Sequence, residues 1–344
     1  MLITAGRTVV RGLVINRYPN VGITLSANGG NIIADNYIGT DTSGSKAFLG
    51  PINYNGIQVY SPNNLIEHNL LSGNMHTNIG VNGPDNIVQG NLVGTDITGT
   101  KTVSQNQVFG VVVTSSNNLI GGTTPDARNV ISGHIGAGML IYGSPTRLNR
   151  VEGNFIGCDI TVRVPLGNTS CGIQIDLSAE DNVIGIEVQA SDHDTIGGLS
   201  PQARNIIAAN STGILISGGS WNVVQGNFIG PNRLGNDGMG NTTVGIRIAS
   251  TKNFIWGMNS GAANVIAFNH TGNPYRCLSL NCFNLGHLWL RCALAEILQD
   301  RYDEVKEPGY YSARFDVANL PSGIYFYRLQ TANYSDIKKM AVVK

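Results

Sequence analysis

Acidic and basic side chains with the spacing that catalysis requires are few in this 344-residue chain. The densest polar cluster is Ser191-Asp-His-Asp194, with Asp181 and Glu187 nearby. Clustered carboxylates can act as general acid and base or can hold a metal ion. The alternative is a solvated loop that carries an inserted segment. The catalytic candidates are Asp176, Asp192 and Asp194, and no residue is assigned to a metal or a cofactor.

A recurring strand phrase, Gly-apolar-x-apolar, would position Asp176. Seven copies begin at Gly22, Gly56, Gly110, Gly138, Gly172, Gly213 and Gly245. In each copy, the x residue and the residue after the phrase point outward, because side chains alternate along a strand. The first outward column is Thr24, Gln58, Val112, Leu140, Gln174, Leu215 and Arg247. The second is Ser26, Tyr60, Thr114, Tyr142, Asp176, Ser217 and Ala249.

These columns are poor in catalytic groups. They hold one carboxylate, Asp176, and one base, Arg247, about two strands away. Glycoside hydrolysis needs two carboxylates ~5–10 Å apart. A lyase needs a base with clustered carboxylates, usually around Ca²⁺. We therefore favour a non-catalytic surface. Tyr60 and Tyr142 could stack on sugar rings, although the simpler interpretation, which we favour, is that they cover the strand surface.

Longer repeats predict the fold. Asn36-Tyr-Ile-Gly-Thr-Asp41 recurs from Asn91, Asn154 and Asn227, and Gly121-Gly-Thr-Thr-Pro-Asp-Ala-Arg-Asn129 recurs from Gly197. Short alternating strands, polar turns and no helical period indicate a parallel β-helix. Aliphatic residues would fill its interior, and stacked Asn residues would occupy its corners in left-handed backbone. We expect ten to twelve coils, a rod ~50 Å long.

Other polar residues are predicted to be structural. Asp41, Asp96 and Asp159 share a repeat position, and we expect them about three coils apart, too far to share a Ca²⁺ ion and better suited to accept turn N–H groups. His68 and His134 stand where other copies have Gly or Asn and are predicted to be corner residues. Cys158 is predicted to be a small buried residue; a disulfide with Cys171 stays open.

Composition restricts the partners. Only 13% of residues are charged and the formal net charge is 0, so we expect no nucleic-acid partner. No apolar run approaches the ~20 residues of a membrane helix. No signal peptide precedes the repeats, so either the protein stays inside the cell or Met1 is an internal start of a longer gene, and we favour the second interpretation.

Residues 1–272 resemble a known class of repeat. Three phrases carry the resemblance: Asn36-Tyr-Ile-Gly-Thr-Asp41, Gly121-Gly-Thr-Thr-Pro-Asp-Ala-Arg-Asn-Val-Ile131 and Asn222-Val-Val-Gln-Gly-Asn227. They are similar to the right-handed parallel β-helix repeats of large bacterial surface and secreted proteins, in the pectin-lyase-like superfamily. The resemblance implies the fold but not one activity, because the superfamily includes lyases, hydrolases, epimerases and non-catalytic adhesins.

Residues 305–344 resemble the C-terminal sorting domain of the type IX secretion system, an immunoglobulin-like sandwich. The phrase Leu320-Pro-Ser-Gly-Ile-Tyr-Phe-Tyr-Arg-Leu329 and the closing Lys338-Lys-Met340 carry the resemblance. It implies export through the outer membrane of a Bacteroidetes-type bacterium, with the secretion machinery as a partner.

Residues 273–304 do not fit the first half of such a sandwich. Within 275–304, Cys277, Cys282 and Cys292 accompany many Leu residues at helical spacing. This stretch is either an amphipathic helix that caps the last coil or a frameshifted segment that leaves the sandwich short of strands.

The resulting expectation is an exported, cell-surface or secreted all-β protein that binds polysaccharide or cell-surface glycan without turnover. The alternative is a polysaccharide lyase or glycoside hydrolase of the same fold. The glycan-binding candidates are Gln58, Tyr60, Tyr142, Gln174 and Arg247.

Overall fold

The computed structural model describes residues 1–48, 52–103, 107–144, 146–176, 195–196, 201–235, 238–255, 264–269, 323–330 and 335–342. The chain divides into two units, Met1–Leu280 and Asn281–Lys344, which are described separately. No helix within these ranges has the length and apolar composition needed to cross a lipid bilayer.

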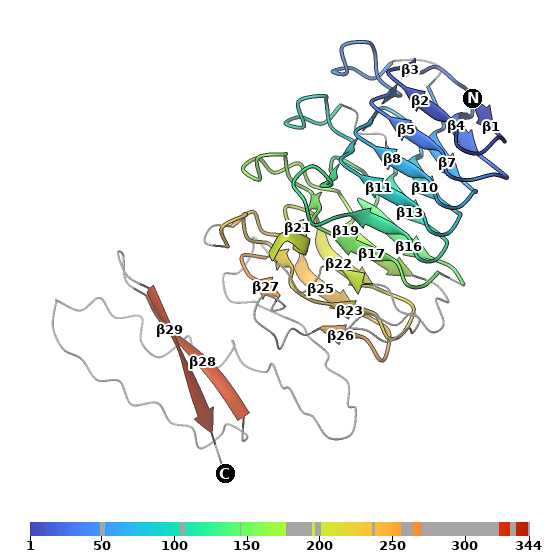
Figure 1. Ribbon diagram of the computed structural model, residues 1–344. Helices are drawn as coiled ribbons and strands as arrows, with labels where there is room; N and C mark the ends of the chain where they lie inside the picture. The colour runs from blue at the N-terminus through green and yellow to red at the C-terminus, as the bar shows by residue number, and fades with distance from the viewer. Residues whose placement is uncertain are drawn as a thin grey trace. The chain divides into compact units, whose positions relative to one another are not determined.

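The first unit contains three parallel sheets of nine strands each, A, B and C (Figure 1). Sheet A consists of β1 (Leu2–Ile3), β4 (Val21–Leu25), β7 (Asn55–Val59), β10 (Thr77–Val81), β13 (Phe109–Val113), β16 (Met139–Tyr142), β19 (Cys171–Asp176), β22 (Thr212–Ile216) and β25 (Val244–Ile248). Sheet B consists of β2 (Val9–Arg11), β5 (Ile32–Ala34), β8 (Leu65–Glu67), β11 (Ile87–Gln89), β14 (Leu119–Gly121), β17 (Arg150–Glu152), β20 (Thr195–Ile196), β23 (Val223–Val224) and β26 (Phe254–Ile255). Sheet C consists of β3 (Val14–Ile15), β6 (Tyr37–Ile38), β9 (Leu70–Leu71), β12 (Leu92–Val93), β15 (Val130–Ile131), β18 (Phe155–Ile156), β21 (Ile206–Ile207), β24 (Phe228–Ile229) and β27 (Val265–Ile266).

Each strand pairs with the strands three places before and after it, so one coil contributes one strand to each sheet. This is a parallel β-helix, as the repeats predict. The described residues form nine coils, not the expected ten to twelve, because loops and insertions use more of the chain than a minimal coil would. At ~4.8 Å per coil, the first and ninth coils are ~38 Å apart, shorter than the expected rod.

Aliphatic side chains fill the interior in register. Ile23 pairs with Ile57, and the same column continues through sheet A. Its further members are Ile79, Val111, Met139, Ile173, Ile214 and Ile246. All eight are fully buried. Burying one such side chain stabilises the fold by about 1.5–3 kcal/mol, so the column binds successive coils together.

Asparagine ladders line the corners. The ladder between sheets B and C (the B–C ladder) consists of Asn36, Asn69, Asn91, Asn129, Asn154, Asn205, Asn227 and Asn264. Each Nδ2 donates to the Oδ1 of the next coil at 2.9–3.1 Å. The prediction of stacked corner amides is confirmed. The left-handed residue is, however, the one before the ladder position, as at Asp35 (φ 54°) and His68 (φ 54°), because the amide must itself lie flat against its neighbour.

Hairpin loops follow β6, β12, β18 and β24, on every second coil, and project from the same side of the helix (Figure 1). Antiparallel bridges close them: Thr40–Ala47, Thr95–Thr102, Cys158–Pro165 and Pro231–Gly238. Asp41, Asp96 and Asp159 accept hydrogen bonds from their own loops, so the turn role predicted for them is confirmed. They lie two coils apart rather than three, or ~10 Å. The spacing is smaller than expected, but it still prevents a shared ion.

The second unit contains an antiparallel pair, β28 (Gly323–Gln330) and β29 (Ser335–Val342). These strands include most of both phrases that resemble a sorting domain, and the predicted antiparallel arrangement is confirmed for them. Residues 273–304 lie outside the described residues, as do those parts of 305–344 that precede, connect and follow the two strands, so neither interpretation of 273–304 is tested.

Candidate functional site

The outward face of sheet A carries the predicted columns in the expected register, with one addition. Gln58 pairs with Gly80 of β10, and Gly80 pairs with Val112. Strand β10 was not predicted from the sequence, because Asn78 occupies the position at which the Gly-apolar-x-apolar phrase has Gly. Gln58 and Val112 are therefore two coils apart, rather than the single coil that the copies suggested.

The side chain of Gln58 contacts the neighbouring strand β10 and the residues that follow it. Its side chain crosses Gly80, where an added Cβ would lie 2.3 Å from Oε1. Asn82 Nδ2 donates to Gln58 Oε1 at 2.7 Å, and Thr114 Oγ1 donates to Asn82 Oδ1 at 2.9 Å. With 9% of its surface exposed, Gln58 offers a ligand little beyond its amide edge.

The two predicted tyrosines are open to solvent. Tyr60, directly after β7, is 55% exposed, and Tyr142, at the end of β16, is 36% exposed. Three coil steps separate β7 from β16 in sheet A, which places the tyrosines ~14 Å apart along the helix. They cannot stack on one sugar ring, but they can contact different rings of one chain.

Gln174, Asp176 and Arg247 lie at the other end of this face. Gln174 Nε2 donates to Asp176 Oδ2 at 3.1 Å, and Asp176 is the register partner of Tyr142. Arg247 is exposed on β25, two strands beyond β19, as predicted. Among the nine strands of sheet A, Asp176 is the only acidic residue and Arg247 the only basic one. The strands therefore bring together no carboxylate pair of the kind hydrolysis needs.

Asp192 and Asp194 lie outside the described residues. In the sequence, Asp194 directly precedes β20, as Asn149 directly precedes β17. Strand β20 belongs to sheet B, not to sheet A.

Sequence reasoning missed an aromatic row at the start of the sheet A strands. The rings of Tyr54 and His76 stack with centroids 5.1 Å apart and planes 9° apart. His76 meets Phe109 edge-on at 5.6 Å. Tyr54 is 42% exposed. The pattern that could have predicted the row is an aromatic residue just before or at the start of three successive strands. It was not seen in the sequence because β10, the middle strand of the three, was not predicted.

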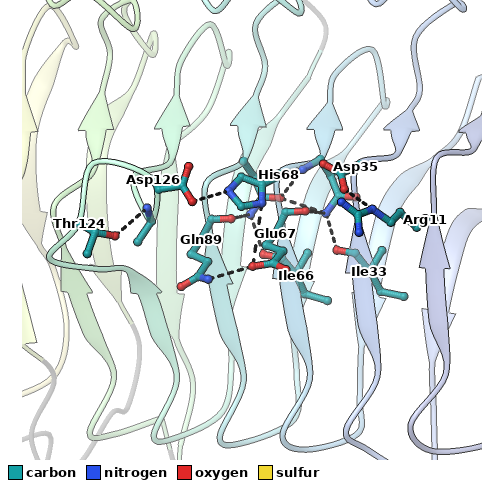
Figure 2. A network of polar contacts seen from close by, with 12 residues as sticks. Arg11, Ile33, Asp35, Ile66, Glu67, His68, Gln89, Thr124 and Asp126 are labelled. Carbon is teal, nitrogen blue, oxygen red and sulfur yellow. Dashed lines mark hydrogen bonds and ion pairs between the residues drawn. The ribbon is translucent and has the colours of Figure 1, made fainter.

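A polar network occupies the corner between sheets B and C (Figure 2). Arg11 Nε lies 2.6 Å from Asp35 Oδ2. His68 Nε2 lies 3.4 Å from Asp126 Oδ2, and Gln89 Nε2 donates to Glu67 Oε2 at 3.0 Å. His68 thus has the predicted corner position and ties the 121–129 insertion to an earlier coil.

This corner does not form a metal centre. No group of three or more His, Cys, Asp or Glu residues in the described ranges is arranged to hold a metal ion. His134, the other predicted corner histidine, is buried in the asparagine ladder between sheets C and A, where Nδ1 lies 2.9 Å from Asn168 Oδ1.

Both described cysteines are buried free thiols, so Cys158 has the predicted structural role and forms no disulfide with Cys171. Burial, and then the charge of Asp159, raise the pKa of the Cys158 thiol far above its ordinary value. A thiol held neutral in this way is a poor nucleophile.

The described strands of sheet A thus carry exposed tyrosine rings and scattered polar groups, and they contain no pair of carboxylates. No protein-family model, curated protein or solved structure matches the chain.

Proposed function

We propose that this chain is the β-helix of an exported, cell-surface or secreted protein that binds glycan without cleaving it, through the outward face of sheet A. The observation that carries the proposal is the set of exposed rings on that face. Tyr60 and Tyr142 present their rings ~14 Å apart along a backbone ladder that is rigid because each inner strand pairs on both sides. Aromatic side chains supply large contact area at low conformational-entropy cost.

Neighbouring residues extend this face. The Tyr54–His76–Phe109 row begins the strands that Tyr60 and its counterparts end. Across the five residues of β7, Tyr54 and Tyr60 are ~20 Å apart at ~3.3 Å per residue. Gln174 and Arg247 add polar groups nearer the other end of the sheet. Such a surface suits an extended polymer better than a small molecule.

The resemblance of 1–272 to pectin-lyase-like repeats favours a glycan as the ligand, and that of 305–344 to type IX sorting domains favours export. The paired strands β28 and β29 are compatible with such a domain. A secreted reporter joined to residues 305–344 should reach the surface or medium of a bacterium with this secretion system. Deleting residues 323–344 should hold the reporter in the periplasm; export of both forms would reject the assignment.

Binding to a polysaccharide panel tests the main proposal. Tyr60→Ala and Tyr142→Ala should each weaken retention about fivefold, since an aromatic contact contributes about 1 kcal/mol. Phe268→Ala, at a ring exposed elsewhere on the helix, is the matched control and should have no effect. Equal binding by all four proteins would reject the sheet A face. Release of reducing or unsaturated ends, abolished by Asp176→Ala, would show an enzyme instead.

A further inference from the structure

The outward face of sheet B carries an exposed aliphatic column. The first residue of each B strand points outward, because side chains alternate along a strand. Over the first five coils these residues pair in register and are all aliphatic: Val9, Ile32, Leu65, Ile87 and Leu119. Val9, Ile32 and Ile87 are exposed, and Leu65 and Leu119 are partly exposed. Four coil steps make the column ~19 Å long.

The fold does not require aliphatic residues in this column. The sixth coil has Arg150 there, as the register partner of Leu119, and the seventh coil has Thr195. The first position of a B strand therefore accepts a polar or charged residue. Single exposed aliphatic side chains are common on soluble proteins, but a contiguous row of them marks a surface that another molecule covers.

The other two faces of the helix differ from sheet B. On sheet C, the outward Phe155 is buried in one cluster with Val162 of the third hairpin. On sheet A, the outward column includes the polar residues Gln58, Gln174 and Arg247. Within the described ranges, sheet B is thus the face whose continuous apolar column stays exposed.

A row of charged side chains borders the column at the corner between sheets B and C. Arg11 pairs with Asp35, and Asp126 pairs with His68, yet the side chains of Arg11 and Asp126 are 71% and 87% exposed. Figure 2 shows these two residues on opposite sides of Glu67, which belongs to the third coil. A positive and a negative group therefore flank the middle of the five-coil column.

We propose that this face of sheet B binds a second copy of the chain, related by a two-fold axis that passes through the third coil parallel to its strands. Such an axis reverses the direction of the second helix, so the five coils pair in reverse order and aliphatic residues meet aliphatic residues throughout. It also brings Arg11 of each copy beside Asp126 of the other copy, which makes the charges complementary. Glu67 comes near its own copy at the axis, but only 23% of its side chain is exposed, and its Oε2 accepts a hydrogen bond from Gln89 Nε2.

The area of the face predicts a weak dimer. Five coils at ~4.8 Å and six residues at ~3.3 Å, 7–12 in the first coil, cover about 480 Å² of each copy. Standard interfaces bury about 800 Å² of each partner, so we expect a dissociation constant in the micromolar range. The formal net charge of 0 produces no general repulsion between copies. The outward face of sheet A stays open in this dimer, and the proposal does not depend on the function proposed for that face.

Sedimentation velocity of the full chain over a series of concentrations tests the proposal. The wild-type chain should shift from monomer to dimer as its concentration rises. Ile87→Lys should raise the dissociation constant at least tenfold, because the dimer would then bury a charge against aliphatic residues. The matched control is Ile135→Lys, at an isoleucine of similar exposure (49% against 38%) that lies between sheets C and A. It should leave the dissociation constant within about twofold of wild type. Circular dichroism should show the same β spectrum for both variants.

Charge reversal tests the two-fold arrangement itself. Arg11→Glu and Asp126→Arg should each dimerise about tenfold more weakly than wild type, since both charge contacts of each variant become repulsive. Mixed in equal amounts, the two variants should form a heterodimer with near wild-type affinity, because every contact between positions 11 and 126 is then again between opposite charges.

Three results would overturn the proposal: a wild-type chain that stays monomeric at all concentrations, a dimer weakened by Ile135→Lys and not by Ile87→Lys, or a mixture of the charge variants that associates no better than each variant alone. A monomeric chain that retains a different protein through Ile87 would also overturn it, and would assign the face to that partner.

Discussion

Two corners of the same β-helix both contain a ladder of hydrogen-bonded polar side chains, but the two ladders differ in their residue types. The B–C ladder consists of Asn alone in eight successive coils. The ladder between sheets C and A (the C–A ladder) consists of Asn53, Asn74, Gln107, His134, Asn168, Asn210, Asn241 and Asn269, with Asn78 inserted from β10. Every member of this second ladder is hydrogen-bonded to at least one other member, whatever its residue type, and Asn78 links Asn74, Gln107 and His134.

The difference follows from where the ladder residue stands relative to the next strand. In the B–C corner, each ladder Asn directly precedes its C strand, even where a longer segment comes before it, as at Asn129 and Asn205. In the C–A corner, the ladder residue lies two residues before the A strand at Asn53, three at Asn74 and five at His134. A constant position fixes the residue type. A variable corner fixes only the requirement for one group that both donates and accepts.

Replacing a member of the uniform ladder should have the largest effect. Asn154 Nδ2 donates to Ile120 O at 2.8 Å and to Asn205 Oδ1 at 3.1 Å, and its Oδ1 accepts from Asn129. Asn154→Ala leaves several buried groups unpaired and should lower the free energy of unfolding by about 4 kcal/mol, measured by urea denaturation. Asn28→Ala, at an exposed Asn whose Nδ2 donates to Thr4 O, should cost under ~1 kcal/mol. Equal losses would mean that the ladder adds nothing beyond one bond.

Acid should weaken the C–A ladder specifically at His134. Asn78 Nδ2 lies 3.0 Å from Nε2, and Asn168 Oδ1 lies 2.9 Å from Nδ1, so these partners assign a neutral ring protonated at Nδ1. A second proton would face the Asn78 amide hydrogens. Burial lowers the pKa of His134 from 6.5 to about 4, although the Asn168 bond opposes the shift.

Because folding lowers the pKa of His134, acid should lower the free energy of unfolding. Above pH 6.5 the ring is neutral in both folded and unfolded chains, and no stability is lost. As the pH falls from 6.5 to about 4, the unfolded chain binds a proton that the folded chain rejects, and the free energy of unfolding should fall by about 3 kcal/mol. Urea denaturation across this pH range, compared with a His134 variant, measures the change. A wild-type profile parallel to that of the variant would contradict it.

Removing the inserted amide should have a smaller effect. Asn78 Oδ1 accepts from Asn74 at 2.7 Å, and its Nδ2 donates to Gln107 Oε1 at 2.8 Å. Asn78→Gly restores the residue that the other sheet A strands mostly have at this position, but it breaks these two links and the one to His134 Nε2. It should cost about 2 kcal/mol in urea denaturation. A neutral result would show that Gln107 and His134 can bond without the insertion.

The sequence made part of this arrangement predictable. Repetition of Asn before each C strand indicated the corner amides, and His134 was identified as a corner residue because it replaced one of them. Strand β10 was missed, because Asn78 removed the Gly on which the strand phrase depended. The exposed tyrosines were also predictable from strand alternation. The burial of Gln58 was not, because it depends on Gly80 in the missed strand.

Converting the irregular corner to the regular one should have the smallest effect. His134→Asn supplies an Oδ1 acceptor for Asn78 and an Nδ2 donor for Asn168, the same two functions that the neutral imidazole provides. At pH 7, its effect should be within ~1.5 kcal/mol of wild type, mostly from the smaller side chain. Its stability between pH 6.5 and about 4 should lack the fall assigned to His134, since nothing at this position titrates. If His134→Asn instead cost as much as Asn154→Ala at neutral pH, the corner would require the ring itself, and bonding capacity alone would not explain which residues a variable corner accepts.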